Sequence, residues 1–116
     1  MGPNQMRRGT TTVILLQLLA EVERPMHGYE IIKELEMRSQ GLFGFKEGLI
    51  YPKLHDMERS GLLAAQWEGE EGTRRRRRYE ITDEGRRRLT QEMADWRAFR
   101  SAMDSLLGIA STGEAE

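Results

Sequence analysis

Five consecutive arginines, Arg74 to Arg78, form the densest charge in the sequence. Guanidinium groups carry a fixed positive charge and fork-shaped donors, so such a run suits contacts to phosphate oxygens or insertion into a DNA minor groove. The alternative without a binding role is a solvated strand whose charges only keep an exposed hairpin in solution. Because adjacent arginines repel one another, the run favours phosphate contacts. In a strand, alternate arginines point to opposite sides, so only some of them reach a partner.

A second candidate site lies just upstream, between Gly48 and Gly61. Read as a helix, this stretch places Ile50, Leu54 and Met57 on one apolar stripe that must pack on a core. Small residues in the first turn allow the opposite face to approach another surface closely, and unpaired first-turn N–H groups suit phosphate. The stretch therefore predicts a helix that docks on a partner. The residues of its docking face are Gly48, Pro52, His55, Asp56 and Arg59, with Tyr51 and Lys53 on the flanks.

The elements around the docking helix predict a winged helix-turn-helix. Gly61 ends the helix as a C′ glycine does, and residues 62–67 read as a short strand. A turn over residues 68–73 leads into the arginine strand, and residues 82–85 open another helix. We therefore expect an α+β fold that is mostly α, with three helices, a two-stranded wing and a long C-terminal dimerisation helix.

The first predicted helix is apolar on nearly every side and stops before Pro25. In so small a domain, a helix that needs two buried faces predicts contact with another chain, and we expect Leu15 and Leu19 at that interface. A second helix starts at His27 and runs about three turns. A turn over residues 39–46 follows. The apolar side chains expected to hold this turn to the core are Leu42, Phe43 and Phe45.

Three segments together resemble the signature of PadR-family transcriptional regulators: PMHGYEI at residues 25–31, GLIYPKLHDMERSGLL at 48–63 and RRRYEITDEGR at 76–86. The resemblance implies a winged-helix repressor that dimerises through its C-terminal helix, and the short chain looks like the smaller subgroup. It also implies that Tyr51 and Pro52 lie against the operator backbone. The expected DNA-binding residues are Gly48, Leu49, Tyr51, Pro52, Lys53, His55, Arg59, Arg74, Arg75, Arg76, Arg77 and Arg78.

Two positions of the docking helix depart from the family pattern. Members commonly carry threonine where this chain has Leu49, and arginine where it has Asp56. An aspartate on a DNA-facing surface repels phosphate, although it can accept a hydrogen bond from cytosine N4. Asp56 therefore weakens general affinity for DNA while permitting discrimination between bases.

The C-terminal helix, predicted for residues 83–108, has near-heptad apolar spacing over about two and a half heptads. This length is too short for a free coiled coil and suits a dimer helix packed on the first helix. Trp96 and Phe99 are either plain dimer core or, paired with their symmetry mates, the walls of a slot for a small aromatic effector. The residues expected at the dimer interface or effector slot are Leu15, Leu19, Leu89, Met93, Trp96, Phe99, Arg100, Met103 and Leu106.

Length and composition exclude several other classes. The chain has 116 residues, a net charge of -1 and no cysteine, which leaves room for one domain without disulfides or thiolate metal sites. His27 and His55 are the only histidines and form no metal-ligand cluster, and no nucleophile elbow or Walker loop is present. We therefore expect no enzyme activity, no metal, no cofactor, no membrane span and a cytoplasmic location.

Near-neutral net charge does not exclude DNA, because eight arginines between residues 74 and 88 face only three acidic residues, a local excess of five. We expect a flexible segment at 1–9, a winged-helix domain at 10–82, the dimerisation helix at 83–108 and a disordered tail at 109–116. The predicted function is a homodimeric repressor of a pseudo-palindromic operator in double-stranded DNA, released by a small-molecule effector. The alternatives are a winged-helix module that binds protein, or a receptor for an anionic nucleotide second messenger.

Overall fold

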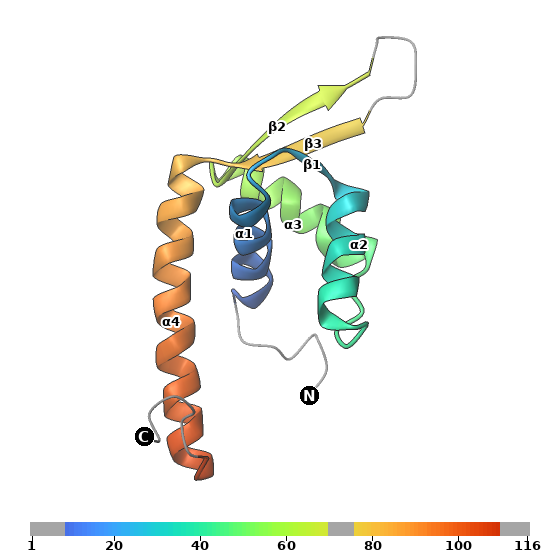
Figure 1. Cartoon of the computed structure of the whole chain (residues 1–116). Helices are drawn as coiled ribbons and strands as arrows, with labels where there is room; N and C mark the ends of the chain where they lie inside the picture. Colours follow the sequence, from blue (N-terminus) through green and yellow to red (C-terminus); the bar gives the residue numbers. More distant parts are fainter. Residues whose placement is uncertain (1–8, 70–75, 110–116) are drawn as a thin grey trace.

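The computed structural model describes residues 9–69 and 76–109 of the chain. The elements follow the order α1 (Thr10–Val22), β1 (Met26–His27), α2 (Gly28–Ser39), α3 (Glu47–Arg59), β2 (Leu63–Glu68), β3 (Arg76–Ile81) and α4 (Asp83–Leu107). Figure 1 shows α1, α2 and α3 gathered below a small sheet, while α4 runs beside α1 and extends well past it. The predicted fold class, a mostly helical winged helix-turn-helix with a long C-terminal helix, is confirmed.

The sheet has one strand more than the predicted two-stranded wing. Its order is β1-β3-β2, and both pairings are antiparallel. β1 pairs Met26 with Tyr79 and His27 with Arg78, so it covers only the middle of β3. Beyond that point the wing is a two-stranded hairpin. A strand of two residues is too short to show any alternation, so β1 could not be predicted from the hydrophobic pattern.

The core lies where the three first helices meet the inner end of the sheet. The predicted stripe of Ile50, Leu54 and Met57 is confirmed, since each of these side chains is at most 3% exposed. Tyr79 projects from β3 into the same cluster. The other buried apolar side chains are Leu15, Leu16, Leu18, Leu19, Met26, Ile31, Leu35, Phe45, Leu62 and Leu63.

Two sequence-based expectations about packing are wrong for the folded protomer. Leu15 and Leu19 lie in its own core, with exposures of 0% and 1%, so they have no free surface for another chain. The physical reason is that α1 packs against α4, β3 and α3 of the same chain, which together cover its second apolar face. Leu42 does not hold the 39–46 turn to the core either, because it is 75% exposed, whereas Phe45 is buried.

The start of α4 is fixed tightly to the end of α3. Thr82 caps α4 by accepting a hydrogen bond from the Gly85 N–H at 3.0 Å, and its hydroxyl donates to the Gly61 carbonyl at 2.7 Å. Gly61 itself adopts a left-handed conformation with a φ of 83°, as expected for a C′ glycine. Gly85 is the only buried residue of α4. The direction of α4 is therefore set within its first turn.

α4 ends at Leu107, one residue before the predicted stop at Gly108. None of the helices within the described ranges has the length and apolar content to span a bilayer. Several expectations fall outside the described residues: those for Arg74 and Arg75, for all but the last residue of the flexible segment expected at 1–9, and for most of the tail expected at 109–116.

Candidate nucleic-acid interface

The exposed face of α3 carries the predicted docking residues. Gly48, Leu49, Pro52, His55 and Arg59 are exposed, and Lys53 is half-buried at the edge of the face. Their side chains share one side of the helix because the opposite side is fixed in the core by its apolar stripe. The structure therefore brings the α3 members of the predicted site together on one surface.

The first turns of α3 are shaped for close approach. A Cβ built on Gly48 would meet nothing within 4 Å, so the helix presents bare backbone there. Pro52 lies inside the helix and has no N–H, which removes the helical hydrogen bond to the Gly48 carbonyl. Both features expose backbone polar groups of α3 to whatever occupies this face.

Tyr51 joins α3 to the start of α2. Its ring lies so close to Gly28 that a Cβ at position 28 would come within 2.2 Å of Tyr51 Cε1. Only glycine at that position allows the ring to lie where it does. Burial raises the pKa of Tyr51, and the Glu47 carboxylate raises it further. The hydroxyl therefore stays protonated and can donate a hydrogen bond at neutral pH.

Asp56, the acidic residue of the docking face, is paired with Arg59 one turn later on the same helix. Both side chains are largely exposed, at 57% and 78% respectively. Exposed pairs of this kind contribute about 0–1 kcal/mol, so the Arg59 guanidinium can exchange Asp56 for another anion at small cost. The pair lowers the net charge of the free surface without fixing either group.

A groove of about 690 Å³ lies between the start of α2, α3 and the wing. Its walls combine aromatic rings with the wing arginines. The residues that line it are His27, Gly28, Tyr29, Glu47, Tyr51, His55, Trp67, Arg76, Arg77 and Tyr79. Arg76 and Arg77 of the wing thus line the same groove as Tyr51 and His55 of α3.

The three described wing arginines have different surroundings. Arg76 is exposed and forms no ion pair with any described residue. Arg77 pairs with Glu58 of α3, and its guanidinium lies 5.1 Å from the centre of the Trp67 ring. Arg78 lies 3.4 Å from the Glu68 carboxylate. The neighbouring residues Arg77 and Arg78 thus contact partners on different elements, α3 and β2, as expected for side chains on opposite sides of a strand.

His27 links the start of α2 to the wing. Its Nε2 contacts the Glu68 carboxylate, and its backbone N–H donates to Glu30 at 2.9 Å as part of the α2 cap. The hydrogen bond with His27 holds the pKa of Glu68 below its usual range, and Arg78 lowers it further. The backbone N–H of His27 likewise lowers the pKa of Glu30. Both carboxylates therefore stay ionised at neutral pH.

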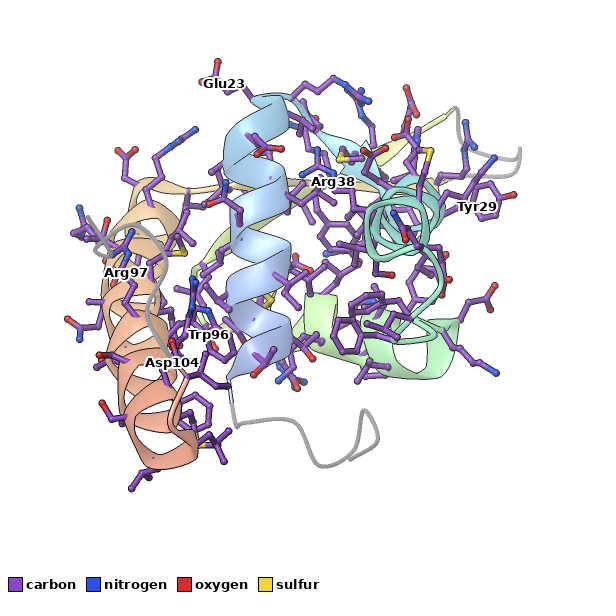
Figure 2. The ribbon with its side chains drawn as sticks, turned by 60° about the horizontal axis from the view of Figure 1, so that its bottom comes forward. Glu23, Tyr29, Arg38, Trp96, Arg97 and Asp104 are labelled. Carbon is purple, nitrogen blue, oxygen red and sulfur yellow. The ribbon has the colours of Figure 1, made fainter. Side chains whose placement is uncertain are left out.

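A second groove, apolar and of about 750 Å³, lies between α1, α2 and α4 of the single chain. Figure 2 places Trp96 on the side of α4 that faces α1, and its ring centre lies 5.7 Å from that of Phe99. Met93 and Met103 line the groove from α4, and Ile14 and Leu18 line it from α1. Of the other predicted interface residues, Leu89 packs against the core, while Arg100 and Leu106 are exposed.

Sequence reasoning missed Glu58, Trp67, Glu68 and the part played by His27. Each of these residues contacts a partner on another helix or strand. In the wing contacts, the two partners are 10 to 41 residues apart along the chain. The sequence offered one signal, the acidic Glu58 beside the apolar stripe of α3. Its partner Arg77 could be identified only once the register of the strands was known. Within residues 9–69 and 76–109, no group of three potential ligands could hold a metal ion.

Comparison with known proteins is consistent with this geometry. The model of the transcriptional regulator PadR-like family matches residues 15–91. A transcriptional regulator from Clostridium thermocellum is 32% identical with a TM-score of 0.76, and the match covers 84% of this chain and 93% of that one. A PadR family regulator from Eggerthella lenta is 31% identical with a TM-score of 0.71, covering 90% and 87% of the two chains.

Bacillus subtilis PadR in complex with operator DNA shares the fold at 20% identity. Its TM-score is 0.65, and the match covers 75% of this chain and 48% of that one. An uncharacterized protein from Lysinibacillus sphaericus is 28% identical over 97 residues, which are 84% of this chain and 87% of that protein. The similarity to these proteins therefore extends over most of the present chain.

Proposed function

This chain belongs to the PadR-like family of transcriptional regulators, and we propose that it is a repressor that binds a pseudo-palindromic operator in double-stranded DNA as a homodimer. The observation that carries this proposal is the surface formed by the exposed side of α3 and the wing. A helix face with a bare first turn, cationic side chains and an adjacent arginine strand fits a major groove flanked by phosphates. The complex of Bacillus subtilis PadR with operator DNA supports DNA as the partner.

In this proposal α3 supplies the base contacts and the wing supplies the backbone contacts. Lys53 and His55 are proposed to reach the edges of the bases. Tyr51 and Pro52 are proposed to lie against the sugar-phosphate backbone of the DNA. The proposed wing contacts include Arg74, Arg75 and the exposed Arg76. Because base edges carry the sequence information, the α3 residues set the operator preference and the wing sets general affinity.

The experiment that tests DNA recognition compares two affinities for each variant. One DNA is a duplex selected by the wild-type protein from a random library, and the other is random duplex. Lys53→Ala and His55→Ala should weaken selected-duplex binding by about 1–3 kcal/mol per good base contact, with a smaller effect on random DNA. Arg97→Ala, a charge removal on α4, is the matched control. If wild-type protein selects no sequence at all, the proposed function is wrong.

The dimer is supported by the apolar surface that α4 leaves uncovered. Trp96 and Phe99 are each 38% exposed, and Leu106 and Leu107 are 80% and 63% exposed at the far end of the helix. A second copy of α4 offers the complementary surface, because an isologous contact places the same apolar groove and helix on both partners. The operator half-sites should then lie about one helical turn apart, or a multiple of it.

Leu106→Glu tests this interface with little risk to the protomer, since the side chain is mostly exposed in the single chain. Sedimentation equilibrium should show a dimer for the wild type and a monomer for Leu106→Glu. Ser101→Glu introduces the same charge on the opposite side of α4 and should leave the dimer intact. A wild-type protein that sediments as a monomer at micromolar concentration would contradict the proposed assembly.

The effector is proposed to be a flat aromatic molecule held near Trp96 and Phe99. The chain has two tryptophans, so Trp67→Phe leaves Trp96 as the only indole that reports on this site. A bound aromatic ligand should quench that fluorescence and lower operator affinity, because linkage requires DNA and effector to weaken each other. Trp96→Ala should retain the dimer and lose the response to the ligand.

A further inference from the structure

The wing needs a support outside its own backbone. β1 reaches β3 only at Tyr79 and Arg78, so from Arg77 outward the wing consists of β2 and β3 alone. A two-stranded hairpin is marginally stable by itself and twists easily. Its direction relative to α3 is therefore determined by side chains that cross from the hairpin to the helix.

Arg77 makes that crossing. It stands directly opposite Trp67 in the β2–β3 register, and its guanidinium lies over the Trp67 ring. From there Nη2 donates to the carboxylate of Glu58, near the end of α3. The contact joins residues 19 positions apart, and both side chains are mostly covered, at 29% and 27% exposure.

The charge of Arg77 is thus already matched within the protein. Glu58 neutralises it at short range, and the Trp67 ring covers one side of the guanidinium plane. Its Nε is buried and finds no acceptor among the described residues. Loss of Glu58 would leave a guanidinium that is largely removed from water without its counterion, which is unfavourable. Arg77 is therefore poorly placed to leave Glu58 for a phosphate.

Arg76 differs from Arg77 in its exposure and in its ion pairing. It is exposed, its side chain points to the other side of the strand, and no described residue forms an ion pair with it. Like Arg77, it lines the groove between the wing and α3. Neighbouring positions of one strand thus hold one arginine that is engaged inside the protein and one that is available.

We propose that Arg77 is a positioning residue that holds the wing at a fixed angle to α3 through Glu58, and that Arg76 is a phosphate contact. This inference rests on the proposed function for its DNA-binding half. Its structural half, the coupling between Arg77 and Glu58, stands independently of DNA. A wing held at a set angle lets α3 and the wing engage the duplex together, without the hairpin having to be ordered on binding.

The experiment applies the same substitution at the two neighbouring positions. Arg76→Met and Arg77→Met are each measured for thermal stability and for the dependence of random-duplex affinity on salt. Arg76→Met should leave the melting temperature unchanged and reduce the slope of log K against log salt by about 0.9, the value for one lost phosphate contact. Arg77→Met should lower the melting temperature and leave the slope unchanged.

Arg77→Met should also reduce the ratio of selected-duplex to random-duplex affinity several-fold, because a wing without its support no longer matches α3. Exchange of the two charges provides the rescue. Arg77→Glu and Glu58→Arg should each destabilise the protein by placing like charges together, and the double variant should recover most of the melting temperature and the affinity ratio.

Two results would overturn the inference. One is a flattened salt slope for Arg77→Met with an unchanged melting temperature, which would make Arg77 a phosphate contact. The other is additive destabilisation in the double variant, which would show that the two residues are not coupled. If the wild-type protein binds no DNA, only the proposed function fails, because the melting temperatures of the exchange series still report whether Arg77 and Glu58 are coupled.

Discussion

Replacing Gly85 by alanine should destabilise the protein, because Gly85 is buried and lets α4 approach Leu62 and Ile81 closely. A Cβ at this position would lie 2.3 Å from the Leu62 carbonyl oxygen and 2.7 Å from Ile81 Cγ1, where ordinary contacts begin at 3.4 Å. The oxygen belongs to backbone that also binds Thr82, so it cannot easily move aside. α4 must therefore shift by about 1 Å.

The expected cost follows from two opposing contributions. Alanine is favoured over glycine inside a helix by up to about 1 kcal/mol. Overpacking typically costs about 1–3 kcal/mol, and a backbone obstacle puts this site at the upper end. The net loss of unfolding free energy is about 2 kcal/mol, which corresponds to a fall of about 8 °C in melting temperature for a chain of this size.

Thermal unfolding followed by circular dichroism at fixed protein concentration measures this change. Gly48→Ala is the matched control, because it makes the same substitution in the first turn of α3, where the added Cβ meets nothing within 4 Å. The control should melt at or above the wild-type temperature. A Gly85→Ala protein that melts no lower than the wild type would refute the argument that α4 is fixed by this contact.

Two further predictions concern charge. Asp56→Asn removes a carboxylate from the docking face and frees Arg59, so it should strengthen binding to random DNA in a gel-shift titration while reducing discrimination between operator variants. Glu30 and Glu68 have lowered pKa values in the folded protein. The stability that they contribute is therefore present above the ordinary glutamate value of about 4.5 and is lost as pH falls through their lower folded-state values. Chemical unfolding between pH 7 and pH 3 should show this loss, and Glu68→Gln should reduce it; an identical pH dependence in that variant would contradict the assignment.

The elements that repeat a helical period could be predicted from the sequence. The stripe of Ile50, Leu54 and Met57 and the near-heptad spacing of α4 place apolar side chains on one side of a helix, and this pattern is visible along the chain. The α3 docking face could be predicted from this stripe, because the side of the helix opposite the buried residues remains exposed. The positions of the helix ends followed from Gly61 and Gly108, which adopt the left-handed conformation.

Contacts between elements could not be predicted in the same way. The apolar surface of α1 correctly indicated two buried faces, but no pattern within α1 says whether α4 of the same chain or another chain covers Leu15 and Leu19. Arg77 and Arg78 are the same residue type at adjacent positions. Their different partners, Glu58 and Glu68, depend on the strand register and on the distance from β3 to α3.

The ion pairs of this surface reconcile a net charge of -1 with the proposed DNA-binding function. Arg77 is engaged with Glu58 in a mostly covered pair. Its charge therefore adds little to the positive potential of the surface. Arg59 is engaged with Asp56 in an exposed pair, which costs little to open. Random DNA gains little from opening that pair, because Asp56 is then left facing phosphates. If the proposed function holds, a sequence that offers Asp56 a base donor and Arg59 a phosphate satisfies both groups at once, so the exposed pair should suppress non-specific binding more than specific binding.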